Sequence, residues 1–306
     1  MQAQLNAELF GHLRVRKDGH EVQLPASKKT RGLLGYLLAS TRPRSRNELC
    51  DLFWEDAEDP RGALRWSLSK LRTTLGPELF ASDRNTIAVN MNLIAVDLVS
   101  IEAAPALLQD GTTHDLEAVE RLFRGEFLNG LELSDCYGFY EWCQAARTRY
   151  GTLNANVLKA LIRRRESNPA QALEFAHKLV GLNPFDEGAH VKVVELLLAL
   201  GRPDEARAQA AQCRKIFQLE LGIEPSSSLD DAFRTAVVRA TPGPAVEGTA
   251  PAGADAEPSI PAAAADFIGR TAERDLIRQA FARPDPRVVL IVGTPGIGKS
   301  ALLAEI

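Results

Sequence analysis

Residues 60–75 read PRGALRWSLSKLRTTL, a stretch with four basic side chains and no acidic one. Four leucines recur at helical spacing and form one apolar stripe that must face a core: Leu64, Leu68, Leu71 and Leu75. Asp59 can cap this helix, Pro60 suits its first turn, and Gly76 ends it. The sequence therefore predicts a helix with an apolar back and a cationic, hydroxyl-bearing front.

The front of this helix carries the side chains that are free to meet another molecule. At about 100° per residue, the side farthest from the stripe carries Gly62, Trp66, Ser69 and Thr73, with Arg61, Arg65 and Arg72 on one flank and Lys70 on the other. Such a front suits the major groove of DNA. A solvated surface helix is the alternative interpretation, and the neighbouring segments have to decide between the two.

A second basic cluster begins the helix that we expect over residues 28–40, which Ser27 can cap. Lys28, Lys29 and Arg31 crowd its first turn, where cations oppose the helix dipole at a cost of about 0.3–1 kcal/mol. An anion bound there would relieve that cost, so a DNA phosphate is the candidate ligand. Surface lysines without a ligand are the alternative.

The segments around the two basic helices follow the order of a helix-turn-helix. In chain order we expect short strands, the capped helix, an arginine-rich loop, a second helix and an acidic connection, at residues 5–24, 28–40, 42–46, 47–53 and 55–59. After the basic helix, residues 78–90 predict a hairpin with Arg84 and Asn85 at its tip. Such a wing can contact the DNA backbone or the adjoining minor groove.

This order of elements resembles the OmpR/PhoB-type winged helix at the DNA-binding end of SARP-type transcriptional activators. The resemblance extends to four sequence segments: LRVRKDGHEVQL, RGLLGYLL, NELCDLFW and ALRWSLSKLRTTL. The resemblance implies that the third helix enters the major groove, with base or backbone contacts from Arg61, Arg65, Ser69, Lys70, Arg72 and Thr73. It also implies that the loop Glu55–Asp59 faces RNA polymerase. Trp66 stands where the family more often has a smaller aliphatic residue, and its role stays open.

From Leu98 to about residue 240 the pattern is helical. The segments that begin at Asn168 and Arg202 align at a spacing of 34 residues, the period of tetratricopeptide-like helix pairs. The motifs GEFLNGL, LNPFDEGAH and LELGIEPSSSL resemble the bacterial transcriptional activation domain that follows the winged helix in SARP-type regulators. His177 and His190 lie on expected helices, where a structural or surface role is far commoner than a catalytic one.

Residues 241–265 have the Pro, Gly and Ala composition of a flexible linker. An apolar strand and GTPGIGKS follow, a P-loop motif whose backbone and side chains cradle phosphates: Gly293, Gly296, Gly298, Lys299 and Ser300. The region before it resembles the beginning of AAA/STAND-type ATPases. Because a Walker B acid and a complete sheet are missing before Ile306, we expect no hydrolysis, and ATP and Mg²⁺ only with a complete domain.

Bulk composition narrows the classes of protein further. The 306 residues carry a net charge of −4, but residues 1–97 hold 14 Lys and Arg against 12 Asp and Glu, which gives +2. A polyanion contact is therefore expected only near the N-terminus. The four cysteines show no metal-ligand spacing, and no signal peptide or membrane span is expected, so the sequence indicates a cytoplasmic protein.

The expected fold class is mainly α, with an α+β winged helix-turn-helix, an all-α tetratricopeptide-like region, a linker and the start of an α/β P-loop domain, at residues 1–97, 98–240, 241–265 and 266–306. We expect a non-enzymatic, sequence-specific transcriptional activator. Its expected partners are double-stranded promoter DNA and RNA polymerase, with homo-oligomers forming on DNA. A signalling P-loop NTPase or an interaction scaffold, whose N-terminal domains are only adaptors, is the alternative.

Overall fold

The chain opens with a four-stranded sheet whose last strand comes from far along the sequence. The structure, a computed structural model, describes residues 5–40 and 42–240. The strand order is β3-β2-β1-β7, and β7 runs parallel to β1 with Leu5 opposite Ile94. The bounds are Leu5–Glu8 for β1, Arg14–Lys17 for β2, His20–Glu21 for β3 and Ile94–Val96 for β7. The first two expected strands are confirmed. The third is shorter than expected and begins at His20, which the sequence places in the turn, and β7 is an addition that the sequence pattern did not predict.

Three capped helices follow, and they are the ones that the sequence predicts. Ser27 Oγ accepts a hydrogen bond from the Thr30 amide at 3.3 Å, and Asp59 Oδ1 accepts one from the Gly62 amide at 2.8 Å. Gly76 ends the third helix with a φ of +101°, a conformation that glycine adopts readily. The bounds are Lys28–Leu38 for α1, Arg46–Trp54 for α2 and Pro60–Leu75 for α3.

The predicted hairpin is confirmed and belongs to a second sheet of order β4-β6-β5. The bounds are Arg44–Ser45 for β4, Pro77–Leu79 for the 3-10 turn η1, Phe80–Ser82 for β5 and Thr86–Val89 for β6. The expectation of a loop over residues 42–46 was wrong in part. Arg44 and Ser45 form a strand there because the outer edge of β6 offers backbone groups that need partners.

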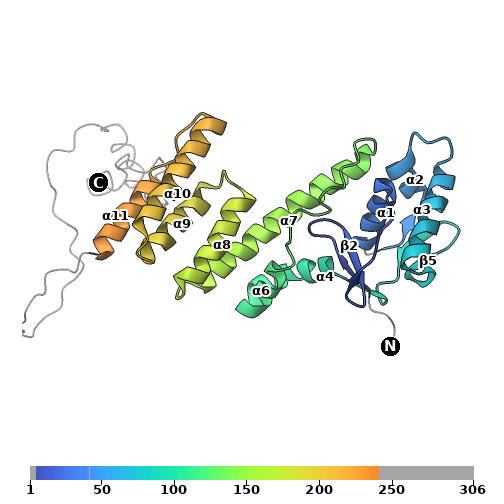
Figure 1. The fold of residues 1–306 in the computed structure, drawn as a ribbon, viewed down its shortest axis with the longest axis horizontal. Helices are drawn as coiled ribbons and strands as arrows, with labels where there is room; N and C mark the ends of the chain where they lie inside the picture. Colours follow the sequence, from blue (N-terminus) through green and yellow to red (C-terminus); the bar gives the residue numbers. More distant parts are fainter. Residues whose placement is uncertain (1–4, 41, 241–306) are drawn as a thin grey trace, which may run out of the picture. The chain divides into compact units, whose positions relative to one another are not determined.

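Most of the rest of the described chain is helical, with antiparallel pairs stacked from α7 onward (Figure 1). The helices are α4 Asp97–Glu102, α5 Ala104–Asp110, α6 Thr113–Glu120, α7 Tyr137–Arg164, α8 Pro169–Leu182, α9 Glu187–Ala199, α10 Pro203–Ile216, the π-helix η2 Phe217–Leu221 and α11 Ser228–Ala240. The helical expectation fails over residues 121–136. Their backbone instead bridges to the N-terminal region at Phe10–Phe127 and His12–Asn129, which gives these polar groups partners.

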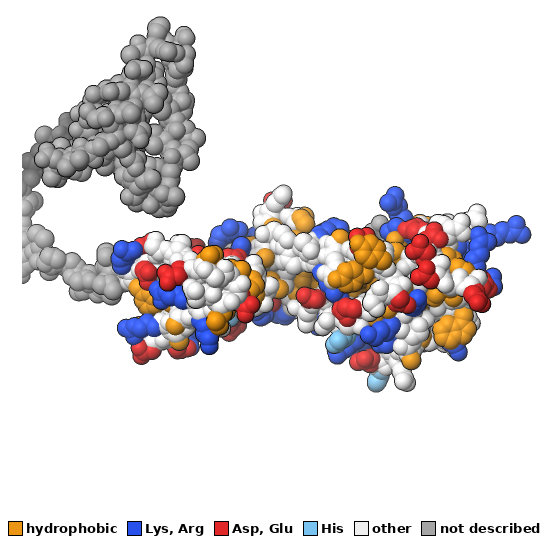
Figure 2. Space-filling model, turned by 90° about the horizontal axis from the view of Figure 1, so that it is seen from above, with side chains coloured by type: hydrophobic (Ala, Val, Ile, Leu, Met, Phe, Trp, Pro, Cys, Tyr) orange, Lys and Arg blue, Asp and Glu red, His pale blue; other side chains and the backbone are white. Residues whose placement is uncertain are grey.

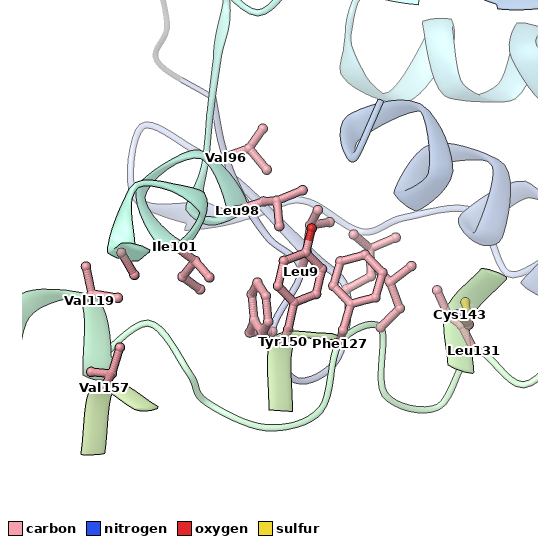
Figure 3. Packing of buried hydrophobic residues seen from close by; sticks show 14 of the residues in the cluster. Leu9, Val96, Leu98, Ile101, Val119, Phe127, Leu131, Cys143, Tyr150 and Val157 are labelled. Carbon is pink, nitrogen blue, oxygen red and sulfur yellow. The ribbon is translucent and has the colours of Figure 1, made fainter. Parts of the chain in front are cut away.

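One apolar core joins the N-terminal sheet to the first helices that follow it. Figure 3 shows Leu9, Phe127 and Tyr150, from three segments far apart in the sequence, gathered in one cluster. The ring of Phe10 meets those of Phe127 and Tyr150 edge-on at centroid distances of 5.6 Å and 5.3 Å. The described residues all fall within one compact unit, Met1–Gly243, so dense contacts cross the predicted domain boundary at residue 97, which stays a prediction.

Asp97 ties the two halves of this core together by hydrogen bonds. Its carboxylate is only 4% exposed and accepts the amide N–H of Leu9 at 2.9 Å and that of Phe10 at 3.4 Å. The guanidinium of Arg124 lies 3.5 Å away. Burial is the largest influence and raises the pKa of Asp97 above its ordinary value, while the two amides and Arg124 act in the opposite direction.

We predict that Asp97→Asn destabilises the fold. The amide group of asparagine brings N–H donors toward the donors on Leu9 and Phe10, so the loss should approach about 1.5–3 kcal/mol of unfolding free energy. Urea denaturation followed by circular dichroism measures the loss. Asp110→Asn, at an exposed carboxylate, is the matched control and should change stability by less than about 0.5 kcal/mol. Equal losses in the two variants would contradict the role of Asp97.

Candidate nucleic-acid interface

Helix α3 buries its leucine stripe as expected. Leu64, Leu68, Leu71 and Leu75 are each at most 5% exposed. Ser67 is buried on the same side, and its Oγ accepts a hydrogen bond from Thr30 Oγ1 at 3.0 Å, which links α3 to α1. Because both the stripe and this bond face inward, the rotation of α3 about its axis is determined.

The opposite side of α3 carries exposed basic and hydroxyl side chains. The exposed members of the predicted set are Arg61, Arg65, Ser69, Lys70 and Thr73. Figure 2 shows Lys and Arg side chains, interspersed with Asp and Glu, at the end of the described region that carries α2 and α3. The exposed positive charge of α3 therefore belongs to the N-terminal region, as the excess of Lys and Arg in residues 1–97 predicts.

Each of the three arginines on α3 is held by a neighbour. Arg61 donates to Asn47 Oδ1 on α2 at 2.9 Å, and Arg65 lies 3.5 Å from the carboxylate of the cap Asp59. The half-buried Arg72 donates to Ser82 Oγ on β5 at 2.7 Å, so it joins α3 to the hairpin. These contacts reduce the freedom of the guanidinium groups, which lowers the entropic cost of presenting them to a ligand.

The hairpin tip is built around Asp83. Its Oδ1 accepts the amides of Asn85 at 2.7 Å and Thr86 at 2.6 Å, and these bonds hold its pKa below the ordinary value. Arg84 is exposed at the tip beside Asn85. Arg46, on α2, donates from Nε to the Asp83 carbonyl at 3.1 Å.

Arg46 is a positioning residue that sequence reasoning missed. It braces the tip of the hairpin from α2, and its own amide also donates to the Asn85 carbonyl at 2.8 Å. The signal in the sequence is the run of three arginines in RPRSR, a segment for which the sequence predicts a loop. Within the same run, Arg44 pairs with Glu48 at 3.0 Å and lies over the Tyr36 ring, so its positive charge is paired with groups of the protein itself.

The basic cluster at the start of α1 divides into three different environments. Lys28 is exposed, whereas Lys29 forms an ion pair with Asp135 at 2.8 Å. Burial opposes the charge on Lys29, but the hydrogen bond that Lys29 donates to Asp135 and the charge of that carboxylate outweigh it, so the pKa of Lys29 is raised. Arg31 is half-buried and donates to the Ala26 carbonyl at 3.0 Å.

Other candidate chemistries find little support in the part of the chain that the structure describes. Its residues hold no group of His, Cys, Asp and Glu arranged for a metal, and the four cysteines are buried thiols. His190 is buried between the Pro184 carbonyl and Gln209, the structural role expected for it. The P-loop residues 293–300 lie outside the described residues. None of the described helices is long and apolar enough to cross a membrane.

We predict that Asp83→Ala loosens the hairpin tip, because the amides of Asn85 and Thr86 lose their acceptor. Hydrogen exchange of these two amides should become faster, while amides in β5 stay protected. In the unchanged protein the lowered pKa keeps Asp83 ionised, so the protection is present at pH above about 4 and is lost as pH falls through the depressed value. Unchanged exchange at the tip in Asp83→Ala would show that other bonds hold it.

One comparison with known proteins matches the helical region, and the others extend over most of the chain. The family model of the bacterial transcriptional activator domain matches residues 100–235, from within α4 to within α11. Regulatory protein AfsR of Streptomyces griseus is 26% identical over 302 residues, which cover 94% of this chain and 31% of that protein. Regulatory protein AfsR of Streptomyces coelicolor is 25% identical over an alignment of 323 positions, which covers 97% of this chain and 32% of that protein. The chain thus spans about a third of the length of these relatives.

A solved structure agrees with the fold. Mycobacterium tuberculosis EmbR, solved in complex with a low-affinity phosphopeptide, superposes with a TM-score of 0.56 at 19% identity, over 79% of this chain and 67% of that one. At this identity the likeness shows the fold alone. The activator-domain match and the two AfsR relatives bear out the resemblance stated from the sequence: residues 100–235 match the bacterial transcriptional activator domain, and the chain is similar to SARP-type bacterial transcriptional regulators.

Proposed function

We propose that this regulator binds specific double-stranded promoter DNA and activates transcription there, with α3 in the major groove. The observation that carries the proposal is the division of α3 into a buried leucine stripe and an exposed front of Arg61, Arg65, Ser69, Lys70 and Thr73. Guanidinium groups pair with guanine edges, and hydroxyl and ammonium groups bind bases or phosphates. The proposal assigns base contacts to Arg65, Ser69 and Thr73.

Phosphate contacts in this proposal come from elements on both sides of α3. Lys28 is exposed at the start of α1, and Arg84 is exposed at the hairpin tip that Asp83 and Arg46 hold in place. Arg72, held by Ser82, supports the hairpin and sits at the edge of the interface. Contacts of this kind position a protein on the duplex without selecting a sequence.

The protein partners of the proposal are RNA polymerase and neighbouring copies of the regulator on DNA. The loop between α2 and α3 carries exposed acidic residues at Glu55, Asp56 and Glu58, which suits a basic surface on another protein. The stacked helices α7 to α11 offer the extended surface that helix-pair repeats use for protein contacts. No catalysis is assigned to residues 1–240.

Selection of bound duplexes from a random pool at ~150 mM salt tests sequence-specific binding. We predict that Arg65→Ala loses about 1–3 kcal/mol on the selected site and much less on random DNA, because a base contact is removed. Arg207→Ala is the matched control, since Arg207 is 66% exposed, close to the 68% of Arg65, and also pairs with an aspartate. Equal losses of Arg65→Ala on both DNAs would reject base contact.

Lys28 and Lys29 should respond differently in a salt titration of DNA affinity. Lys28→Ala should weaken binding to all DNA sequences alike, because one phosphate contact is lost. It should also lower, by about one, the slope of log affinity against log salt concentration. Asp135→Asn should raise the slope by about one, because it releases Lys29 from its ion pair. Asp110→Asn changes the net charge equally and should leave the slope unchanged. A slope unaffected by Asp135→Asn would exclude Lys29 from the interface.

A further inference from the structure

Trp66 is the one large side chain on the outermost ridge of α3. The other members of that ridge are small: Gly62, Ser69 and Thr73. A Cβ at Gly62 would lie 2.1 Å from the cap carboxylate of Asp59, so a larger residue there would require that carboxylate to shift. The indole therefore projects from α3 with no comparable neighbour along the same ridge.

The indole is exposed although the helix has a well-formed buried side. Trp66 is 54% exposed, whereas Trp54 is 8% exposed and Trp142 packs edge-on against Tyr36 at 4.8 Å. The ammonium group of Lys70 lies 5.5 Å from the centroid of the Trp66 ring, a cation–π distance. This exposed aromatic surface is unfavourable in water, and covering it by a ligand would be favourable.

The charges around the indole favour a nucleic acid as the occupant. Lys70 lies against the ring, Arg65 is exposed on the same helix in an ion pair with Asp59, and α3 itself carries four basic residues and no acidic one, a charge that attracts a polyanion. Within a major groove, thymine is the base that presents an apolar group, its C5-methyl. An indole is mostly apolar surface with a single N–H donor, so it matches a methyl group better than the oxygen or amino edges of the other bases.

We propose that Trp66 is a specificity-determining residue whose indole covers the C5-methyl group of one thymine in the bound site. This inference rests on the proposed function, because it requires α3 to enter the major groove. Ser69 and Thr73, small and exposed on the same ridge, leave the base edges within reach of the indole. The side chain would then select T over C at one position without a hydrogen bond.

Uracil substitution tests the methyl contact directly, because uracil differs from thymine only by that methyl group. Each thymine of the selected site is replaced in turn by uracil, and binding of the full chain is measured. One replacement should weaken DNA binding by the unchanged protein about fourfold, which is the effect of one buried methyl group. The same replacement should leave DNA binding by Trp66→Ala unchanged. Trp66→Phe retains an apolar ring and should keep part of the effect. Circular dichroism verifies that both variants fold.

Tyr137→Ala is the control, because Tyr137 is an aromatic residue 71% exposed outside α3, and it should show the same uracil effect as the unchanged protein. If no uracil replacement weakens the unchanged protein, or if Trp66→Ala retains the effect, the inference is overturned. Normal DNA binding by Trp66→Ala with reduced activation would also overturn it and assign the indole to a protein partner. Failure of the unchanged protein to select any sequence would instead overturn the proposed function itself.

Discussion

The parallel pairing of β7 with β1 is the constraint on which the rest of the structure depends. It brings the chain at residue 97 back to the N-terminal sheet, where the Asp97 carboxylate accepts the amides of Leu9 and Phe10. The next helices therefore start against this sheet, and Phe127 and Tyr150 complete a core around Phe10. Winged helix and activator domain are stabilised together, because removing either would expose aromatic surface of the other.

This shared core also explains why the front of α3 is left exposed. Its leucine stripe packs inward, the Ser67–Thr30 bond fixes its rotation, and the remaining elements pack on other sides. The activator domain reaches the winged helix through α7, whose Phe139 packs on Phe53 of α2 at 4.9 Å between ring centroids. The ion pair of Lys29 with Asp135 has the same origin, because the segment before α7 lies against the start of α1.

The sequence was informative wherever a local pattern determines the structure. The caps at Ser27 and Asp59, the leucine spacing of α3 and the turn at residues 83–85 are local, and all were predicted. The strand β7, the strand at Arg44–Ser45 and the bridges of residues 127–129 to the N-terminal region depend on partners distant in the sequence, so periodicity could not predict them. For the same reason the sequence predicts Lys29 as a DNA contact without showing its partner Asp135, and it does not indicate Arg46, whose bracing role appears only in the folded hairpin.

Helix α7 has 28 residues, which at 1.5 Å per residue makes a rod of about 42 Å. Its first turns contact α2 and its last turns pack against α8, with α6 alongside. A helix of this length can curve gently, but a sharp kink would need a local break in its hydrogen-bond ladder. One continuous helix therefore contacts both the repeat helix α8 and α2, and α2 in turn packs against the third helix and braces the hairpin tip through Arg46.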